Sequence, residues 1–138
     1  MTSMLRLTFP SRPEYVVLSR LVLSGLARAQ AIGPNELGDL KLAVTEASSN
    51  SVRHAYDRAG GTVEIVYELG DSHIAIEVWD EGCGFDARAS EPEPGALDEG
   101  GLGLSIIHAV CDETRLGRAS GGTGSWIRFV KRIGGEDA

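Results

Sequence analysis

The segment 46-EASSNSVRHAY-56 places a carboxylate, Glu46, four residues before a carboxamide, Asn50. It belongs to a stretch, 37–56, whose apolar residues recur at helical spacing: Leu37, Leu40, Val44 and Ala47. A step of four residues turns a helix by about 400° and climbs about 6 Å, so the two side chains point the same way. Glu46 is a candidate base, and Asn50 is a neutral oxygen ligand for a hard cation. Phosphoryl transfer from a magnesium nucleotide uses this pair of groups.

A second polar element follows an apolar run that predicts a strand. Asp80 ends this run, and Gly82 and Gly84 in 80-DEGCGF-85 let the chain turn away without a Cβ in the path. A buried aspartate at a strand end must find hydrogen-bond donors, and the exocyclic amine of adenine is one. Asp80 is therefore a candidate adenine contact.

A third element, 100-GGLGL-104, opens a predicted helix. Its glycines leave backbone N–H groups bare at the positive end of the helix dipole, which suits an anion such as a phosphate. Further along, Gly122-Thr123 offers a hydroxyl for a hydrogen bond near the Asp80 carboxylate.

Each element also has an ordinary structural interpretation when it is taken alone. Glu46 and Asn50 fit a solvated helix face, and His54 fits a packing or capping position. An Asp-x-Gly sequence forms a plain turn, a Gly-x-Gly sequence forms a loop hinge, and a strand threonine needs no ligand. The combination and its order along the chain are what favour a nucleotide site.

Composition excludes several other classes of protein. A chain of 138 residues with 42% apolar content fits one globular domain, 1–138, with a core that needs no disulfides. The net charge is −7, and the longest basic run is Lys131-Arg132, so phosphate-neutralising nucleic-acid binding is not expected. Two widely spaced cysteines suit a reducing cytosol. With neither a leader pattern nor a membrane-length apolar run, we expect a soluble, cytoplasmic protein.

The remaining pattern predicts an α+β fold, a two-layer α/β sandwich. We expect a mixed, mainly antiparallel sheet with helices packed on one face. The expected strands are 4–9, 62–69, 73–80, 114–118 and 125–133, with a hairpin turn at 70–72. The expected helices are 14–30, from 34 or 35 to about 57, and 102–111. In the first helix the predicted apolar stripe is Tyr15, Leu18, Val22, Leu26 and Ala29.

An acidic, proline-containing stretch, 86–100, has no usable periodicity. A loop of that length inside a compact domain is more often functional or disordered than merely connective.

Together these motifs resemble the Bergerat-type (GHKL) ATP-binding fold of gyrase, DNA-mismatch-repair ATPases and sensor histidine kinases. Within that superfamily, the chain is most similar to the small bacterial anti-sigma factor serine-protein kinases. The matching segments span nearly the whole chain: 46-EASSNSVRHAY-56, 80-DEGCGF-85, 100-GGLGL-104 and Gly122-Thr123.

The resemblance implies a role for each motif. Glu46 would be the base and Asn50 the Mg²⁺ ligand, while Asp80 would contact the adenine of ATP. Residues 86–100 would form the lid over ATP, and Arg20 falls where such kinases engage protein partners across a dimer. The other residues implied in nucleotide binding are His54, Gly82, Gly84 beneath the adenine ring, Gly101, Leu102, Gly103, Leu104 and Thr123.

One departure from the family concerns charge near the terminal phosphate. Some members place an arginine just before the phosphate-binding glycines, whereas this chain has Asp98-Glu99-Gly100 and only Arg88 as a cation in 86–100. An acidic lid repels a nucleotide of about four negative charges unless Mg²⁺ and backbone N–H groups offset it.

The resemblance implies an ATP- and Mg²⁺-dependent serine/threonine-protein kinase. It would bind a sigma factor, phosphorylate an anti-anti-sigma (STAS-type) antagonist and form a homodimer. The alternative is a non-catalytic, nucleotide-binding anti-sigma or adaptor module. A fragment of a sensor histidine kinase fits less well, because Glu46 supplies a base that those kinases do not place there and no preceding helical hairpin carries a phosphoacceptor histidine.

Overall fold

The structure is a computed structural model that describes residues 3–55, 61–80, 102–118 and 125–133. Its strands are β1 (Ser3–Pro10), β2 (Thr62–Leu69), β3 (His73–Asp80), β4 (Glu113–Arg118) and β5 (Ser125–Arg132). Its helices are η1 (Pro13–Tyr15, a 3-10 turn), α1 (Val17–Ala29), α2 (Pro34–Ala55) and α4 (Leu102–Val110). The element order matches the one predicted from the sequence.

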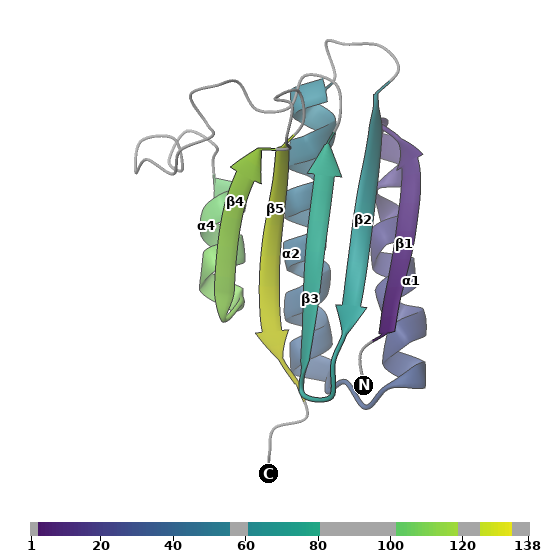
Figure 1. Cartoon of the computed structure of the whole chain (residues 1–138), viewed down its shortest axis with the longest axis vertical. Coiled ribbons are helices and arrows are strands. Elements are labelled where there is room, and N and C mark those ends of the chain that lie inside the picture. The colour runs from purple at the N-terminus through teal and green to yellow at the C-terminus, as the bar shows by residue number, and fades with distance from the viewer. Residues whose placement is uncertain (1–2, 56–60, 81–101, 119–124, 134–138) are drawn as a thin grey trace.

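The five strands form one sheet in the order β1-β2-β3-β5-β4 (Figure 1). Every pairing among the described strands is antiparallel. The prediction of a mainly antiparallel sheet is therefore confirmed. The parallel pairing that a mixed sheet would also contain is not found in the part of the chain that the structure describes. Short links, such as the hairpin between β2 and β3, join neighbouring strands in opposite directions.

The β2–β3 hairpin turns where the sequence predicted it. The backbone N–H of Gly70 donates to the carbonyl of His73 at 2.9 Å. A Cβ on Gly70 would overlap the imidazole of His73, so any larger residue here would require that side chain to move. Because the turn is fixed, β3 keeps its register and Asp80 falls at the strand's far end, opposite Val63.

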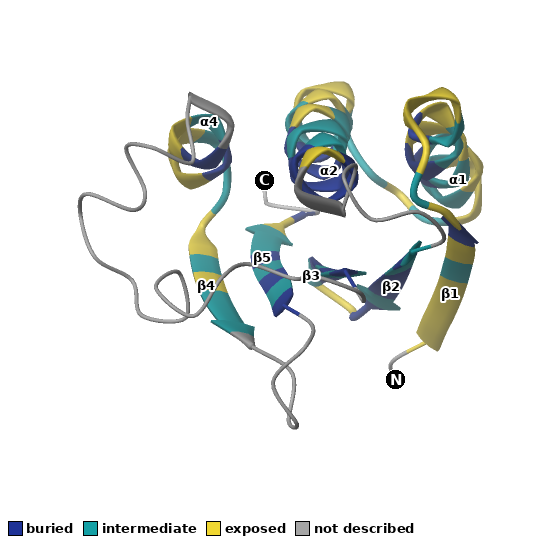
Figure 2. Cartoon of the chain, turned by 90° about the horizontal axis from the view of Figure 1, so that it is seen from above, coloured by how far each residue is buried: buried dark blue, intermediate teal, exposed yellow. Residues whose placement is uncertain are grey.

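Helices α1, α2 and α4 lie together on one face of the sheet (Figure 2), as predicted. Side chains of alternate strand positions meet the helices to form the core. Its fully buried residues include Leu23, Leu40, Val44, Ile65, Tyr67, Ile76, Ile107 and Phe129. None of the described helices is both long enough and apolar enough to cross a lipid bilayer.

The first predicted helix, 14–30, needs correction. Its start is the separate 3-10 turn η1, and the α-helix begins only at Val17. The tighter turn shifts the face that meets the sheet, so Val16, Ser19 and Leu23 are buried. Of the predicted stripe, Tyr15, Val22 and Leu26 are half-buried and pack against the core, Leu18 is half-buried, and Ala29 is exposed.

The opposite face of the sheet carries no helix in the described structure (Figure 2). It presents an indole pair, Trp79 and Trp126, whose ring centroids lie 6.0 Å apart. Arg128 forms salt bridges with Glu68 at 3.2 Å and Glu77 at 3.1 Å. This face is therefore partly covered by its own side chains.

Candidate functional site

Helix α2 carries the two residues from which the sequence analysis began. Its small and apolar residues at 40, 43, 44 and 47 pack against the sheet and are buried. Asn50 lies at the buried edge of the helix, with only 5% of its surface exposed. Glu46, one turn earlier, is half-buried. The pair therefore shares one side of α2, as its spacing predicted.

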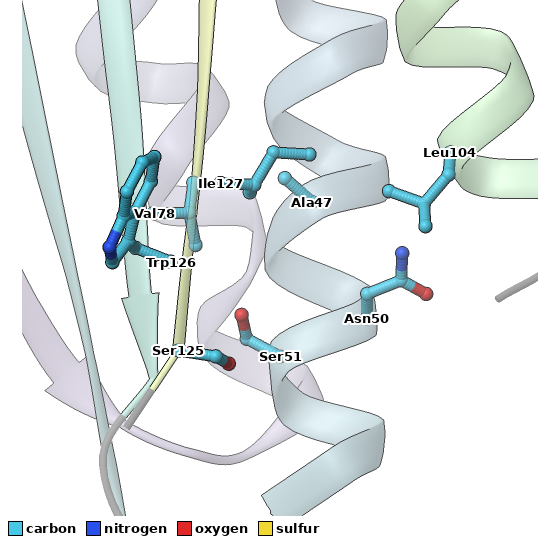
Figure 3. Close-up of a pocket in the computed structure, with 8 residues that line it drawn as sticks. All are labelled: Ala47, Asn50, Ser51, Val78, Leu104, Ser125, Trp126 and Ile127. Atoms are coloured by element: carbon cyan, nitrogen blue, oxygen red, sulfur yellow. The ribbon is translucent and has the colours of Figure 1, made fainter. Parts of the chain in front are cut away.

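The side chain of Asn50 points toward α4, where it faces Leu104 (Figure 3). Both residues line a small cavity between α2, α4 and the sheet. Its volume is about 10 Å³, room for roughly one water molecule. The lining residues are Ala47, Asn50, Ser51, Val78, Leu104, Ser125, Trp126 and Ile127. A purine does not fit in the space that the described residues enclose, and other predicted parts of the site lie outside them.

The carboxylate of Asp80 lies at the end of β3 and is 2% exposed. It stands directly opposite Ser125, the first residue of β5. The Ser125 hydroxyl donates to Asp80 Oδ2 at 3.5 Å, and Ser125 is itself 1% exposed. The structure thus brings a buried carboxylate, a buried hydroxyl and the Asn50 amide to one region, through strand pairing and the packing of α2.

Arg53 adds a contact that the sequence analysis did not anticipate. Its Nη2 donates a hydrogen bond to Asn50 Oδ1, the oxygen assigned to a metal ion. Ser51, which lies beside Asn50 in the cavity, was also missed. Both residues fall inside the segment 46–56. Side chains three residues apart on a helix are neighbours, so the spacing from Asn50 to Arg53 could have predicted their contact.

Other predicted site residues divide into three groups. Leu104 is buried on α4. His54, Leu102 and Gly103 are helical, but the structure does not describe their burial or contacts. Those that lie outside the described residues are Gly82, Gly84, Gly101, Thr123 and the predicted lid 86–100.

Arg20 does not belong to this cavity. It lies exposed on α1 and lines a separate groove between α1 and α2. Its position agrees with a role away from the nucleotide.

Lys131 of β5 contacts the end of α4, the helix that supplies Leu104. Lys131 Nζ donates to the carbonyl of Val110, the last residue of α4, at 2.7 Å. The same ammonium pairs with Asp39 of α2 at 2.8 Å. Burial lowers the pKa of Lys131, but the hydrogen bond and charge of Asp39, together with the charges of Asp112 and Cys111, outweigh it and raise the pKa overall. One side chain therefore ties α2, α4 and the sheet together.

The residues present suit a magnesium nucleotide. Asn50 offers a neutral amide oxygen, and Mg²⁺ takes only one or two protein ligands when phosphates and water supply the others. Within the described residues, no cluster of three or more histidine, cysteine or acidic side chains is placed to hold a metal ion. Buried Asp80 offers an acceptor for an amine on a heterocycle.

Comparison with known proteins identifies the family. The model of the histidine kinase-like ATPase domain matches residues 9–131. Serine-protein kinase RsbW of Bacillus licheniformis is 37% identical over 134 residues, covering 89% of this chain and 83% of the relative. RsbW of Bacillus subtilis is 36% identical, with 92% and 84% covered. RsbW of Staphylococcus epidermidis is 34% identical, with 93% and 87% covered.

Two solved structures share the fold. The RsbU and RsbW domains of Rv1364c from Mycobacterium tuberculosis match with a TM-score of 0.70 at 19% identity, over 95% of this chain and 32% of that longer chain. The SiaB–SiaC complex from Pseudomonas aeruginosa matches with a TM-score of 0.65 at 18% identity, over 94% of this chain and 89% of that one. With this fold, the motif order and the RsbW relatives in agreement, the chain belongs to the histidine kinase-like ATPase family and, within it, to the RsbW-type serine-protein kinases.

Proposed function

We propose that this protein is an ATP-dependent serine/threonine-protein kinase that also acts as an anti-sigma factor. The observation that carries the proposal is the shared side of α2, where half-buried Glu46 stands one turn from buried Asn50. Asn50 lines a small cavity, and Ser125 lines the same cavity. Ser125 is the residue whose hydroxyl donates to Asp80. The proposed base, metal ligand and heterocycle contact would therefore come from adjacent elements.

Each residue has a distinct task in this mechanism. Asn50 would hold Mg²⁺, which neutralises phosphate charge when bound. Asp80 would accept a hydrogen bond from the adenine amine, while Gly82 and Gly84 leave room beside the ring. Further nucleotide contacts would come from His54, Gly101, Leu102, Gly103, Leu104 and Thr123, with residues 86–100 as the lid of one domain spanning 1–138.

Glu46 would take the proton of the attacking hydroxyl. As the seryl oxygen bonds to the γ-phosphorus and the bond to the β-phosphate oxygen breaks, this proton moves to the Glu46 carboxylate and ADP leaves. Helix α2 fixes Glu46 and Asn50 relative to each other, which would hold the proposed base beside the proposed metal ligand.

The proposed partners are proteins. The substrate is an anti-anti-sigma (STAS-type) antagonist, and the second partner is a sigma factor held inactive, with Arg20 contributing to the interface. We also propose a homodimer in the cytoplasm, which size-exclusion chromatography with light scattering would detect at twice the 14.6 kDa mass of one chain.

The direct experiment is incubation with γ-labelled ATP, Mg²⁺ and candidate STAS proteins. Label on a serine or threonine of one candidate is expected, and its absence with every candidate would reject the kinase. The second candidate function, a non-catalytic nucleotide-binding anti-sigma or adaptor module, draws on one observation: Arg53 engages the Asn50 oxygen that a metal ion would use. ATP binding and sigma-factor capture without transfer would favour it.

A further inference from the structure

Arg53 follows Glu46 by two turns of helix α2, with Asn50 between them. At about 100° and 1.5 Å per residue, Arg53 lies about 20° from Glu46 around the helix and about 4.5 Å beyond Asn50 along its axis. Helical side chains lean toward the N-terminus of their helix, so Arg53 reaches back over Asn50. The structure shows this contact, because Arg53 Nη2 donates a hydrogen bond to Asn50 Oδ1. The guanidinium therefore ends at the oxygen that the proposed function assigns to Mg²⁺.

The guanidinium of Arg53 pairs with no carboxylate in the part of the chain that the structure describes. Its acceptor is the neutral amide of Asn50. By contrast, Arg6, Arg12 and Arg128 each pair with at least one carboxylate. Arg53 is also exposed, so it can leave the amide without disturbing the core. A phosphate can accept two parallel N–H donors from a guanidinium, which a single amide oxygen cannot match.

The rest of the proposed nucleotide site is poor in positive charge. None of the residues that line the cavity at Asn50 is a cation. The proposed lid, 86–100, contains five carboxylates and a single arginine, Arg88. Of the cations that the structure describes, Arg53 is the one hydrogen-bonded to Asn50. A triphosphate carries about one negative charge more than a diphosphate and needs more of this compensation.

The γ-phosphate is the group that Arg53 is placed to reach. Mg²⁺ holds its oxygen ligands at about 2 Å in an octahedron, so neighbouring oxygens lie about 3 Å apart. A guanidinium that contacts Asn50 Oδ1 therefore also reaches a phosphate oxygen on an adjacent corner. Mg²⁺ bridges oxygens of the β- and γ-phosphates in phosphoryl transfer. Glu46 distinguishes the two, because the proposed base must lie beside the γ-phosphorus and Arg53 shares its side of α2.

We propose that Arg53 binds the γ-phosphate of ATP, exchanging the Asn50 oxygen for a phosphate oxygen, and that it thereby makes the protein prefer ATP to ADP. The inference rests on the proposed function, which places the nucleotide at Asn50. The exchange moves the guanidinium by about one oxygen–oxygen distance and leaves Asn50 Oδ1 to Mg²⁺. ADP lacks the phosphate that draws Arg53 away, so it gains nothing from this side chain.

The first test is calorimetry of Mg-ATP and Mg-ADP binding to the full chain, in the wild type and in Arg53→Gln. The substitution should weaken ATP binding at least about tenfold, as expected for loss of a hydrogen bond between charged groups, and ADP binding less than about twofold. The matched control is Arg28→Gln, which removes the same charge from an exposed position in the last turn of α1. It should leave both affinities within about twofold, and circular dichroism establishes that each variant is folded.

The conservative variant Arg53→Lys separates charge from structure. An ammonium keeps the positive charge without the paired donors, so this protein should lose less of its preference for ATP than Arg53→Gln does. A preference that falls equally in both variants would contradict a role for the charge.

The second test observes the phosphates directly. Phosphorus NMR of the bound, non-hydrolysable β,γ-imido analogue of ATP, with Mg²⁺, compares the wild type with Arg53→Gln. The γ resonance should shift more than the α and β resonances. A shift centred on the α or β resonance would overturn the assignment to the γ-phosphate.

Three calorimetric results would also overturn the role of Arg53. They are an unchanged ratio of ATP to ADP affinity in Arg53→Gln, an equal change of that ratio in Arg28→Gln, and tighter ATP binding in Arg53→Gln. The last result would show that Arg53 instead obstructs the metal ligand Asn50. A wild-type protein that binds neither nucleotide refutes the proposed function and the role of Arg53 with it. A wild-type protein that binds ATP, with an Arg53→Gln variant of unchanged ratio, refutes only the role of Arg53.

Discussion

Ser125 and Asp80 face each other across β5 and β3, with Ser125 Oγ 3.5 Å from Asp80 Oδ2 and both side chains almost fully buried. A buried carboxylate is stable only when hydrogen-bond donors surround it. At 3.5 Å this hydroxyl contributes a long hydrogen bond, so a ligand amine could approach the carboxylate without breaking a short hydrogen bond from Ser125.

Asp80→Asn should abolish measurable ATP binding, because an amide that replaces the carboxylate brings its own donors toward the adenine amine. Ser125→Ala should weaken ATP binding by less, about threefold to tenfold, since it removes one long hydrogen bond to the Asp80 carboxylate, worth about 1 kcal/mol. Calorimetry with Mg²⁺ measures both. Unchanged affinity in a folded Asp80→Asn protein would remove Asp80 from the site.

Glu46→Gln should slow phosphate transfer to the antagonist at least about 10²-fold, the lower range for general-base assistance. Glutamine keeps the size of the side chain, so Mg-ATP affinity should stay within a few fold. Single-turnover transfer assays beside calorimetry separate these effects. Transfer at the wild-type rate would leave the base assignment without support.

Lys131→Met should lower the free energy of unfolding by about 1 kcal/mol, because the Val110 carbonyl and Asp39 both lose a charged donor. The matched control is Arg6→Met, which breaks an exposed salt bridge with Glu64 whose side chains are 64% and 36% exposed. Exposed pairs contribute little, so the control should change stability by less than about 0.5 kcal/mol. Urea denaturation gives both values, and equal losses would contradict the anchoring role of Lys131.

The protein should lose stability as pH rises above about 9. Burial raises the pKa of Cys111 to about 12, whereas an unfolded thiol ionises near pH 8.5. Between these values the unfolded state has released its proton and the folded state has kept it, so the free energy of unfolding falls with rising pH. Burial also raises the pKa of Tyr67, whose hydroxyl donates to the Ser19 carbonyl, and this extends the loss above pH 10.

Urea denaturation from pH 7 to 10 measures this dependence, and its slope from one thiol is at most about 1.4 kcal/mol per pH unit. Cys111→Ala is the control, because it removes the thiol and should flatten the curve between pH 8.5 and 10. An unchanged slope in that variant would show that Cys111 does not cause the loss.

Local patterns predicted most of the fold. Strands β2 and β3 have the bounds expected from their composition, and the helix with Glu46 and Asn50 follows its apolar spacing. These features depend on neighbours a few residues away, which the sequence displays directly. The start of α1 was not predicted from local patterns, because its 3-10 turn and buried face depend on how the segment packs against the sheet.

The sequence by itself determined which chemical groups are present and which share a helix face or end a strand: Glu46 with Asn50, and Asp80 after an apolar run. Only the tertiary structure decided that Ser125 lies against Asp80 and that Arg20 and Arg53 line one groove. Residues 45 positions apart meet through strand register, and residues on two helices meet through packing. Both are set by the burial of the whole core, so no local pattern contains them.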